Sequence, residues 1–295
     1  MNKPPATIPT RLRWRYAIGV PLVHVLALAG LYFFSYTGLL VALIGLYVFG
    51  TLGINLCYHR LLTHRSFVVP LWLEHGLAIL GVCSLQDTPA IWVAMHRMHH
   101  AHSDKEEDPH SPLVNLLWGH CGWLMTDNRE FTNLNYYQRY AKDLLRDPFY
   151  LRLERNGLWF IIYLAQTIPF FFVGWVFGGL WFGISLMIWG VFVRTVLVWH
   201  ITWMVNSVGH RWGYQSYDTK DSSRNSHLVA LISNGDGWHN NHHADQRAAR
   251  HGHRWHELDV TYYTIKLLEC MGLVTNIVPV TTTHNHANRK SQEAI

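Results

Sequence analysis

The sequence predicts an all-α integral membrane protein, with four transmembrane helices in two hairpins and a cytoplasmic helical cap that holds a histidine-rich metal site. Three observations predict this fold. Two long blocks carry no charged side chain, the polar segments between and around them hold nearly all the charges, and most of the 21 histidines gather in short clusters. Only 15% of the 295 residues are charged, against roughly 25% in an average soluble domain. The high apolar content excludes a disordered, collagen-like or coiled-coil chain.

The two charge-free blocks cover residues 16–57 and 157–193. Each is about twice the ~20 residues that cross the hydrocarbon core of a bilayer. Each also has a turn signal near its middle, at residues 35–38 in the first block and at 178–179 in the second. We therefore expect membrane hairpins rather than two buried hairpins of a soluble core. The four expected spans are residues 16–34, 39–57, 157–177 and 180–205.

The positions of the basic residues predict the orientation in the membrane. Both hairpin turns are uncharged, whereas every Lys and Arg except Arg194 lies before the first span, between the second and third, or after the fourth. The positive-inside rule then assigns both termini and the metal site to the cytoplasmic side, of the inner or plasma membrane in a bacterium. The N-terminal segment lacks a small-residue cleavage site, so we expect no removable signal peptide. The net charge of +5 fits anionic lipids, and no nucleic-acid partner is expected.

We expect a single domain over residues 1–295. Its expected parts are a cytosolic N-terminal segment (1–15), two transmembrane hairpins (16–57 and 157–205), a cytosolic cap (58–156 and 206–280) and a flexible tail (281–295). The four cysteines form no C-x-x-C pair, which argues against a disulfide scaffold or a thiolate zinc site.

Histidines form three clusters and one further pair with an asparagine. The clusters are His59 with His64, then His96, His99 and His100, and then His239, His242 and His243; the pair is Asn206 with His210, just past the fourth span. Positions i, i+3 and i+4 share one helix face, so each triplet can point at one centre. His59 and His64 are five residues apart, and we expect them where the helix leaving the second span ends, with their rings reaching the centre from different sides. An even number of spans separates the polar segments, so all the clusters lie on one side of the membrane.

Nine clustered imidazoles predict two metal ions. Crowded histidines repel one another when charged near neutral pH, and a bound metal holds them neutral. One tetrahedral zinc takes four ligands, so nine suit two ions of higher coordination number. Imidazole suits iron, zinc, copper or nickel. A lipid chain can reach a metal centre that lies just outside an apolar helix bundle. Iron with oxygen supplies the chemistry needed to oxidise an unactivated methylene.

These motifs resemble the membrane fatty-acid desaturase family. The resemblance is to its delta-9 branch, which includes the stearoyl-CoA desaturases and the bacterial and cyanobacterial acyl-lipid enzymes. It runs from about residue 53 to about residue 273 and includes, in family order, H-x-x-x-x-H, H-x-x-H-H, N-S-x-x-H and H-N-x-H-H. The N-S-x-x-H element and the stretch G-H-C-G-W-L at residues 119–124 favour desaturases over related membrane hydroxylases.

The resemblance implies a di-iron site and assigns its ligands. One iron would take His59, His64, His96, His100 and His242, and the other would take His99, His210, His239 and His243, with Asn206 reaching it through a water molecule. The resemblance also implies a bent acyl tunnel whose polar cluster matches Gln86, Trp92 and Thr202, followed by Trp203. Some nearby carboxylates are expected to orient ligand imidazoles, the candidates being Asp104, Glu106, Glu107, Asp108, Asp236 and Asp245.

The implied activity is oxygen-dependent formation of a cis double bond at the delta-9 position of a saturated acyl chain. Two electrons would come from a separate donor, such as a ferredoxin or a cytochrome b5-like protein. Stearoyl-CoA desaturases contact coenzyme A with an Arg-Asp pair and two adjacent arginines, but the matching positions here are Ala94, Met95, Leu113 and Val114. A phosphate clamp needs Arg or Lys, so an acyl-lipid substrate is favoured over acyl-CoA.

Two other functions fit parts of the pattern. A membrane di-iron hydroxylase of alkyl chains or sterols would use the same histidine boxes and differ in its product. A metal transporter would carry ionisable ligands inside its spans. Here the clusters flank the spans, which hold little beyond His24, Arg194 and His200.

Overall fold

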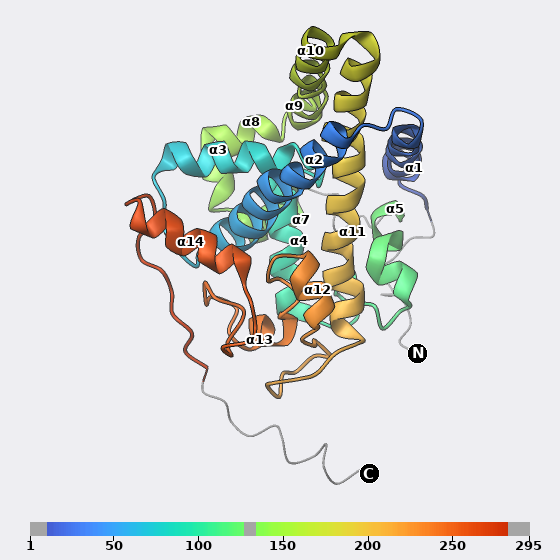
Figure 1. The fold of residues 1–295 in the computed structure, drawn as a ribbon. Coiled ribbons are helices and arrows are strands. Elements are labelled where there is room, and N and C mark those ends of the chain that lie inside the picture. The colour runs from blue at the N-terminus through green and yellow to red at the C-terminus, as the bar shows by residue number, and fades with distance from the viewer. Residues whose placement is uncertain (1–10, 127–133, 283–295) are drawn as a thin grey trace.

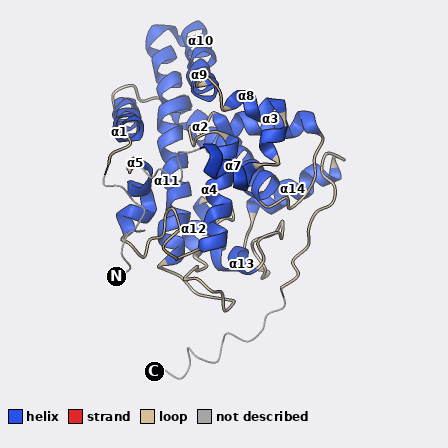
Figure 2. Cartoon of the chain, turned by 180° about the vertical axis from the view of Figure 1, so that it is seen from behind, coloured by secondary structure: helices blue, strands red, loops and turns tan. Residues whose placement is uncertain are grey.

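The computed structural model describes residues 11–126 and 134–282, and within them every regular element is a helix (Figures 1 and 2). Strand-like pairing in these two ranges is limited to isolated bridges, such as the one between Val68 and Thr275. The prediction of an all-α fold is therefore confirmed. Much of the expected N-terminal segment (residues 1–10) and of the expected tail (residues 283–295) lies outside the described residues.

The first charge-free block breaks at its predicted turn. Its helices are α1 (Trp14–Leu28), η1 (Ala29–Leu31), α2 (Tyr36–Gly45) and η2 (Leu46–Thr63). The second helix starts after Ser35, whose backbone is extended and whose hydroxyl accepts a hydrogen bond from the Gly38 N–H at 2.9 Å. Such an N-cap satisfies a backbone donor that has no partner within the helix. The turn residues therefore separate two apolar helices, as the sequence predicts.

The second charge-free block reverses its direction at a glycine. Its helices are α9 (Leu158–Ala165), α10 (Thr167–Met187), η5 (Ile188–Val193) and α11 (Arg194–Ser207). Inside α10, Gly179 has a φ of 75° and a ψ of −174°, which glycine adopts readily because it has no Cβ. The chain turns back there, and Figure 1 shows the two arms side by side at the end of the molecule marked α10. The arms touch closely, since a Cβ on Gly174 would lie 2.6 Å from the Phe182 carbonyl oxygen.

Three helical stretches are long and apolar enough to cross a membrane. They are Trp14–Leu31, Tyr36–Thr63 and Leu158–His210. The last of these contains the reversal at Gly179. Stretches of this length and composition are characteristic of a membrane protein.

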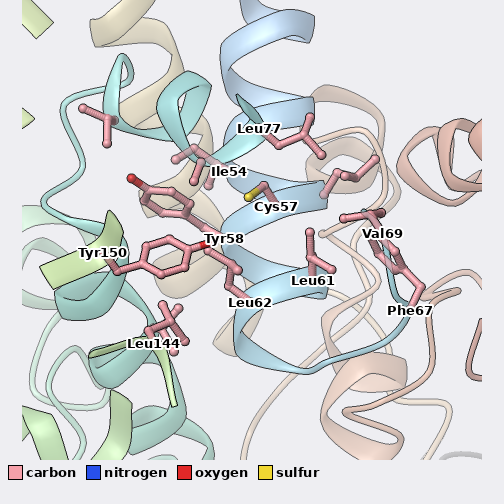
Figure 3. Close-up of a cluster of buried hydrophobic side chains, with 14 of the residues drawn as sticks. Ile54, Cys57, Tyr58, Leu61, Leu62, Phe67, Val69, Leu77, Leu144 and Tyr150 are labelled. Carbon is pink, nitrogen blue, oxygen red and sulfur yellow. The ribbon is translucent and has the colours of Figure 1, made fainter. Parts of the chain in front are cut away.

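The remaining helices lie within residues 58–156 and 206–280, the two ranges expected to form the cap. They are α3 (Leu71–Val82), α4 (Pro89–His102), η3 (Trp118–Gly122), α5 (Trp123–Met125), α7 (Leu134–Ala141), η4 (Leu144–Arg146), α8 (Pro148–Leu153), η6 (Val208–His210), α12 (His227–Ile232), α13 (His239–Ala244) and α14 (Val260–Cys270). Helix α3 packs along η2, and α4 packs against both α7 and η2. Figure 3 shows the resulting core, in which Ile54, Cys57, Leu61 and Leu62 of η2 lie near Leu77, Leu144 and Tyr150. This core fixes the end of η2 beside α4.

One carboxyl group in the cap makes stability depend on pH. Burial raises the pKa of Glu154 to about 7 from its usual 4.5, although the Tyr137 hydroxyl donates to it at 3.1 Å. Because the folded pKa exceeds the unfolded one, the protonated carboxyl stabilises the folded protein below about pH 4.5, and this contribution is lost as the pH rises through 7.

We therefore expect the melting temperature in detergent micelles to fall between about pH 5 and pH 8, and Glu154→Gln to flatten this slope. Gln carries no titrating proton and keeps the side-chain shape. An unchanged slope in the variant would assign the pH dependence to other groups.

Candidate metal centre

The predicted histidine boxes come together in the cap. Helix η2 supplies His59 and is followed directly by His64, and His210 ends η6. Helix α4 carries His96, His99 and His100, and α13 carries His239, His242 and His243. All nine side chains are buried except His100, which is half-buried. Segments far apart in the sequence thus meet in one region, close to where α4, α12 and α13 are labelled in Figure 1.

The nine side chains form two groups. The five-histidine group consists of His59, His64, His96, His100 and His242, and the four-histidine group consists of His99, His210, His239 and His243. Within each group, one ring nitrogen of every member lies within 4.8 Å of those of the others. This division is the one that the family resemblance implies for two irons. The role of these residues as metal ligands stays a prediction.

The winding of η2 explains how His59 and His64 join one group. The His64 N–H donates to the His59 carbonyl at 3.2 Å, an i→i+5 bond of the π type. This wider turn brings residues five apart close together, and their ring centroids lie 5.0 Å apart at 70°. On an ideal α-helix the two positions would not share a face.

Helix α4 is held in register by its N-terminal cap and by one arginine. Thr88 caps the helix by accepting from the Ile91 N–H at 3.3 Å. Arg97, on the same helix as the second box, donates to the carbonyls of Thr63 at 3.0 Å and Leu62 at 2.8 Å. The guanidinium therefore satisfies carbonyl groups at the end of η2, next to His64. This contact couples the position of the first box to that of the second.

The short helix α13 is held by asparagines. The Asn225 amide oxygen accepts from the N–H groups of Asn240 at 3.0 Å and Asn241 at 3.2 Å. Asn241 in turn donates to Glu257 at 2.8 Å. The two asparagines between His239 and His242 thus anchor the helix on the side away from the histidines.

Four carboxylates determine which ring nitrogens face the centre. Nδ1 of His59 bonds to Asp236 at 3.0 Å, and Nδ1 of His99 bonds to Asp108 at 3.0 Å. Nδ1 of His210 bonds to Asp104 at 3.3 Å, and Nδ1 of His243 bonds to Asp221 at 2.7 Å. An ionised carboxylate only accepts hydrogen bonds, so in its neutral form each of these rings carries its proton on Nδ1. Its Nε2 then presents a lone pair. Such second contacts commonly orient metal-binding histidines.

The four-histidine group has a contact that neutral rings alone do not satisfy. The Nε2 atoms of His99 and His243 lie 3.3 Å apart. When both rings are neutral, their protons are held on Nδ1, so this contact joins two lone pairs and no N–H is available to bridge them. A bound cation would turn the contact into an attraction. An all-imidazole donor set suits a transition metal, so these residues fit the implied ions.

The five-histidine group is equally crowded with donor atoms. Nε2 of His242 lies 3.0 Å from that of His59 and 2.9 Å from that of His100, and the latter lies 3.0 Å from that of His96. An imidazole nitrogen carries at most one proton. A string of such contacts at one point is the arrangement expected of ligands that share a cation.

The carboxylates remain ionised at neutral pH. Burial would raise the pKa of Asp104, but its hydrogen bonds with His210 and Ser222 lower it to about 2. Burial likewise opposes ionisation of Asp108, and the His99 imidazole nevertheless holds the pKa of that carboxyl well below its usual value. The centre therefore places ionised carboxylates behind the ring nitrogens, and their negative charge favours a cation.

We expect Asp221→Asn to lower the metal affinity of the four-histidine group about 10–100-fold. Oδ1 of Asp221 accepts from the Ser223 N–H at 3.0 Å, so in the variant the amide NH2 would face Nδ1 of His243. His243 would then carry its proton on Nε2, where the lone pair is needed. Metal titration measures the change. The control is Asp245→Asn, since Asp245 bonds to Thr281 and Thr282 instead, and equal losses in both variants would contradict the tautomer argument.

Three of the four predicted tunnel residues are joined by hydrogen bonds. The Gln86 amide donates to Thr202 Oγ1 at 3.0 Å and accepts from Trp92 Nε1 at 3.2 Å. The Trp92 ring lies 5.0 Å from the ring of His96, so the cluster adjoins the five-histidine group. Trp203 packs elsewhere, stacked on Trp199 at 5.5 Å. Asn206 lies on α11, one turn before His210.

Several residues of the centre escaped the sequence analysis. Asp221 lies in a loop far from the boxes, and no motif marks it as the partner of His243. Of the predicted carboxylates, Asp104, Asp108 and Asp236 contact box histidines, whereas Asp245 bonds to Thr281. His251 is buried with its ring 4.3 Å from that of His242, and His110 lies 4.4 Å from His99. Only their proximity to the boxes in sequence could have signalled them.

Three further histidines form a chain within the bundle. Nε2 of His24 lies 3.0 Å from that of His200, whose Nδ1 lies 3.0 Å from Nε2 of His120. His120 Nδ1 in turn lies 3.0 Å from the Ser207 hydroxyl. These contacts join α1 and η3 to α11, so the histidines satisfy one another inside an apolar region.

The fold and the centre together define a class of protein. It is a helical membrane protein with converging histidine groups that could hold metal ions. The comparison with protein families is more specific, since the model described as "Fatty acid desaturase" matches residues 34–266. The chain belongs to the fatty acid desaturase family and is an oxidoreductase of the desaturase type.

Curated relatives cover most of the chain. A protein of Nostoc sp. (strain 36) named sn-2 palmitoyl-lipid 9-desaturase is 42% identical over 91% of this chain and 91% of its own length. The sn-1 stearoyl-lipid 9-desaturase of Anabaena variabilis is 42% identical over 83% of this chain and 85% of its own. An acyl-CoA 5-desaturase of Anemone leveillei is 41% identical over 86% of this chain and 76% of its own.

Proposed function

We propose that this chain forms a cis double bond at the delta-9 position of a saturated acyl chain carried by a membrane lipid. The observation that carries the proposal is the pair of histidine groups next to the cluster of Gln86, Trp92 and Thr202. Relatives named as lipid 9-desaturases, at 42% identity, support the delta-9 position of the double bond and a membrane lipid as the carrier of the acyl chain.

In this proposal the five-histidine and four-histidine groups would each hold one iron, with Asn206 as an additional residue of the second site. Bound iron with oxygen supplies the redox chemistry that an unactivated methylene requires. Overall, the acyl chain loses two hydrogens, and O2 with two electrons and two protons becomes two waters. The protein orients the imidazoles through ionised carboxylates and presents one pair of methylenes. The electrons come from a separate donor, a ferredoxin or a cytochrome b5-like protein.

The residues that replace the coenzyme A contacts favour a lipid carrier. Ala94 is fully buried and Met95 is 7% exposed, and Ala94 packs with Tyr137 and Ala141 of α7. These side chains belong to an apolar core and offer no charge to a phosphate. A phosphate clamp at this point would need Arg or Lys.

We also propose four spans with a cytoplasmic centre in a single domain. The reversal at Gly179 would divide the stretch Leu158–His210 into the third and fourth spans. Uncharged hairpin turns and basic flanking segments support cytoplasmic termini and a cytoplasmic cap.

Expression in a host that lacks its own desaturase tests the function. Gas chromatography of the host lipids should reveal new monounsaturated chains, and mass spectrometry should place the double bond at carbon nine. Hydroxylated chains in their place would identify a membrane hydroxylase instead. Assays of the purified protein on phospholipids and on acyl-CoA test the carrier, and equal activity on both would refute the preference for lipid.

A further inference from the structure

The loop between α3 and α4 has an uncommon backbone. Leu85 has a φ of 53° and Asp87 has a φ of 63°, a region that residues with side chains rarely adopt. Gln86, which bonds to Thr202 and Trp92, lies between these two residues. A backbone of this kind persists only where its surroundings hold it in place.

Contacts with all three apolar helical stretches hold this loop. Trp199 Nε1 donates to the carbonyls of Ser84 and Leu85, both at 3.0 Å. Gln166 donates to the Cys83 carbonyl at 3.0 Å, and the Ser84 hydroxyl donates to the Phe49 carbonyl at 3.0 Å. The Tyr16 hydroxyl donates to the Asp87 carboxylate. We call the side chains of Tyr16, Ser84, Gln166, Arg194 and Trp199 the loop clamp. They link the loop to α1, to the junction of α9 and α10, to α11 and, through the Phe49 carbonyl, to η2.

Arg194 is a charged residue inside an apolar stretch, and its contacts with other clamp residues explain its position there. Its Nη2 donates to the Gln166 side-chain oxygen at 2.7 Å, which turns the amide NH2 of Gln166 toward Cys83. Nε of Arg194 donates to the Gly190 carbonyl at 2.9 Å, and the guanidinium lies 3.8 Å from the centre of the Phe49 ring. The guanidinium is fully buried and orients the donor that fixes the start of the loop.

We propose that the loop clamp sets where along the acyl chain the double bond forms, because it fixes Gln86 relative to Trp92, Thr202 and the adjoining histidines. This inference rests on the proposed desaturase function. The members of the clamp are positioning residues, since they act on the substrate through Gln86.

The physical reason is the short distance between neighbouring methylenes. A displacement of about 1 Å at a reactive centre changes rates by ~100-fold, and a single methylene step along the chain is of that size. A loop that moves this far presents the next pair of carbons. Both ends of the Gln86 amide are bonded, so a change in its backbone moves the whole polar cluster.

Trp199→Phe and Ser84→Ala test the inference. The first removes the donor to two loop carbonyls, and the second removes one hydrogen bond with minimal change in volume. In each variant we expect the share of product with a displaced double bond to rise about fivefold, the factor that corresponds to about 1 kcal/mol for one hydrogen bond. Mass spectrometry of derivatised acyl chains measures this ratio even when the yield is low. Iron content should stay at the wild-type level.

Trp189→Phe is the matched control. Trp189 Nε1 also donates to a backbone carbonyl, that of Gly30 at 3.1 Å, but at a point away from the loop. Its isomer ratio should equal that of the wild type. A wild-type ratio in both clamp variants, or an equal change in the control, would refute the role of the clamp. Absence of unsaturated product from the wild-type protein would instead refute the proposed function.

Discussion

Replacing His99 or His243 by alanine should abolish desaturation. Both residues belong to the four-histidine group, and their Nε2 atoms face each other at 3.3 Å. Loss of either removes a proposed ligand. Loss of a residue that only orients a ligand already lowers metal affinity or activity 10–100-fold. We expect activity to fall by at least ~100-fold and iron content to fall by at least about half. Lipid analysis of an expressing host and iron analysis of purified protein measure the two effects.

His256→Ala is the control for these variants. His256 is exposed, lies in the cap and belongs to neither histidine group. It should keep both the activity and the iron of the wild-type protein. Full activity in His99→Ala and His243→Ala would show that the histidine groups have another role.

Replacing Arg60 by methionine should give the largest loss of stability. Arg60 is fully buried and donates to Asp236 at 3.0 Å, to Asp259 at 2.9 Å and to the Ala249 carbonyl at 2.7 Å. The variant leaves two carboxylates buried without this partner, which typically costs about 3–5 kcal/mol. Asp236 also holds His59, so the five-histidine group should lose iron affinity as well. Thermal unfolding in detergent micelles and iron analysis test both expectations.

Arg65→Met provides the comparison with an exposed ion pair. Arg65 bonds to Asp143 at 2.9 Å, and both side chains are 41% exposed. Exposed pairs contribute about 0–1 kcal/mol, so this variant should melt close to the wild type. If both variants lost the same stability, burial of the Arg60 pair would not be the cause.

The two triplets of histidines were predictable because local geometry determines them. On α4 and α13 the spacing i, i+3, i+4 brings three rings to one face whatever the rest of the fold does. The apolar helices were predictable for a similar reason, since a long charge-free run has few alternatives to a membrane helix. The break at Ser35 and the reversal at Gly179 both fall in predicted turns.

Other features depend on contacts that no local pattern encodes. The closeness of His59 and His64 requires the π winding of η2, whereas α-helical spacing suggests rings that approach from different sides. Asp221 reaches His243 from a loop 22 residues away, and such a loop can follow many paths. The loop clamp likewise depends on how the apolar helices pack, and its donors are spread from Tyr16 to Trp199.

The histidines of the two groups alternate along the same two short helices. His99 lies between His96 and His100 on α4 but belongs to the other group, and on α13 His242 is separated in the same way from His239 and His243. Each helix therefore carries histidines of both groups. If both groups bind iron as proposed, binding at one would align the helix for the other, so the two ions should bind and dissociate cooperatively.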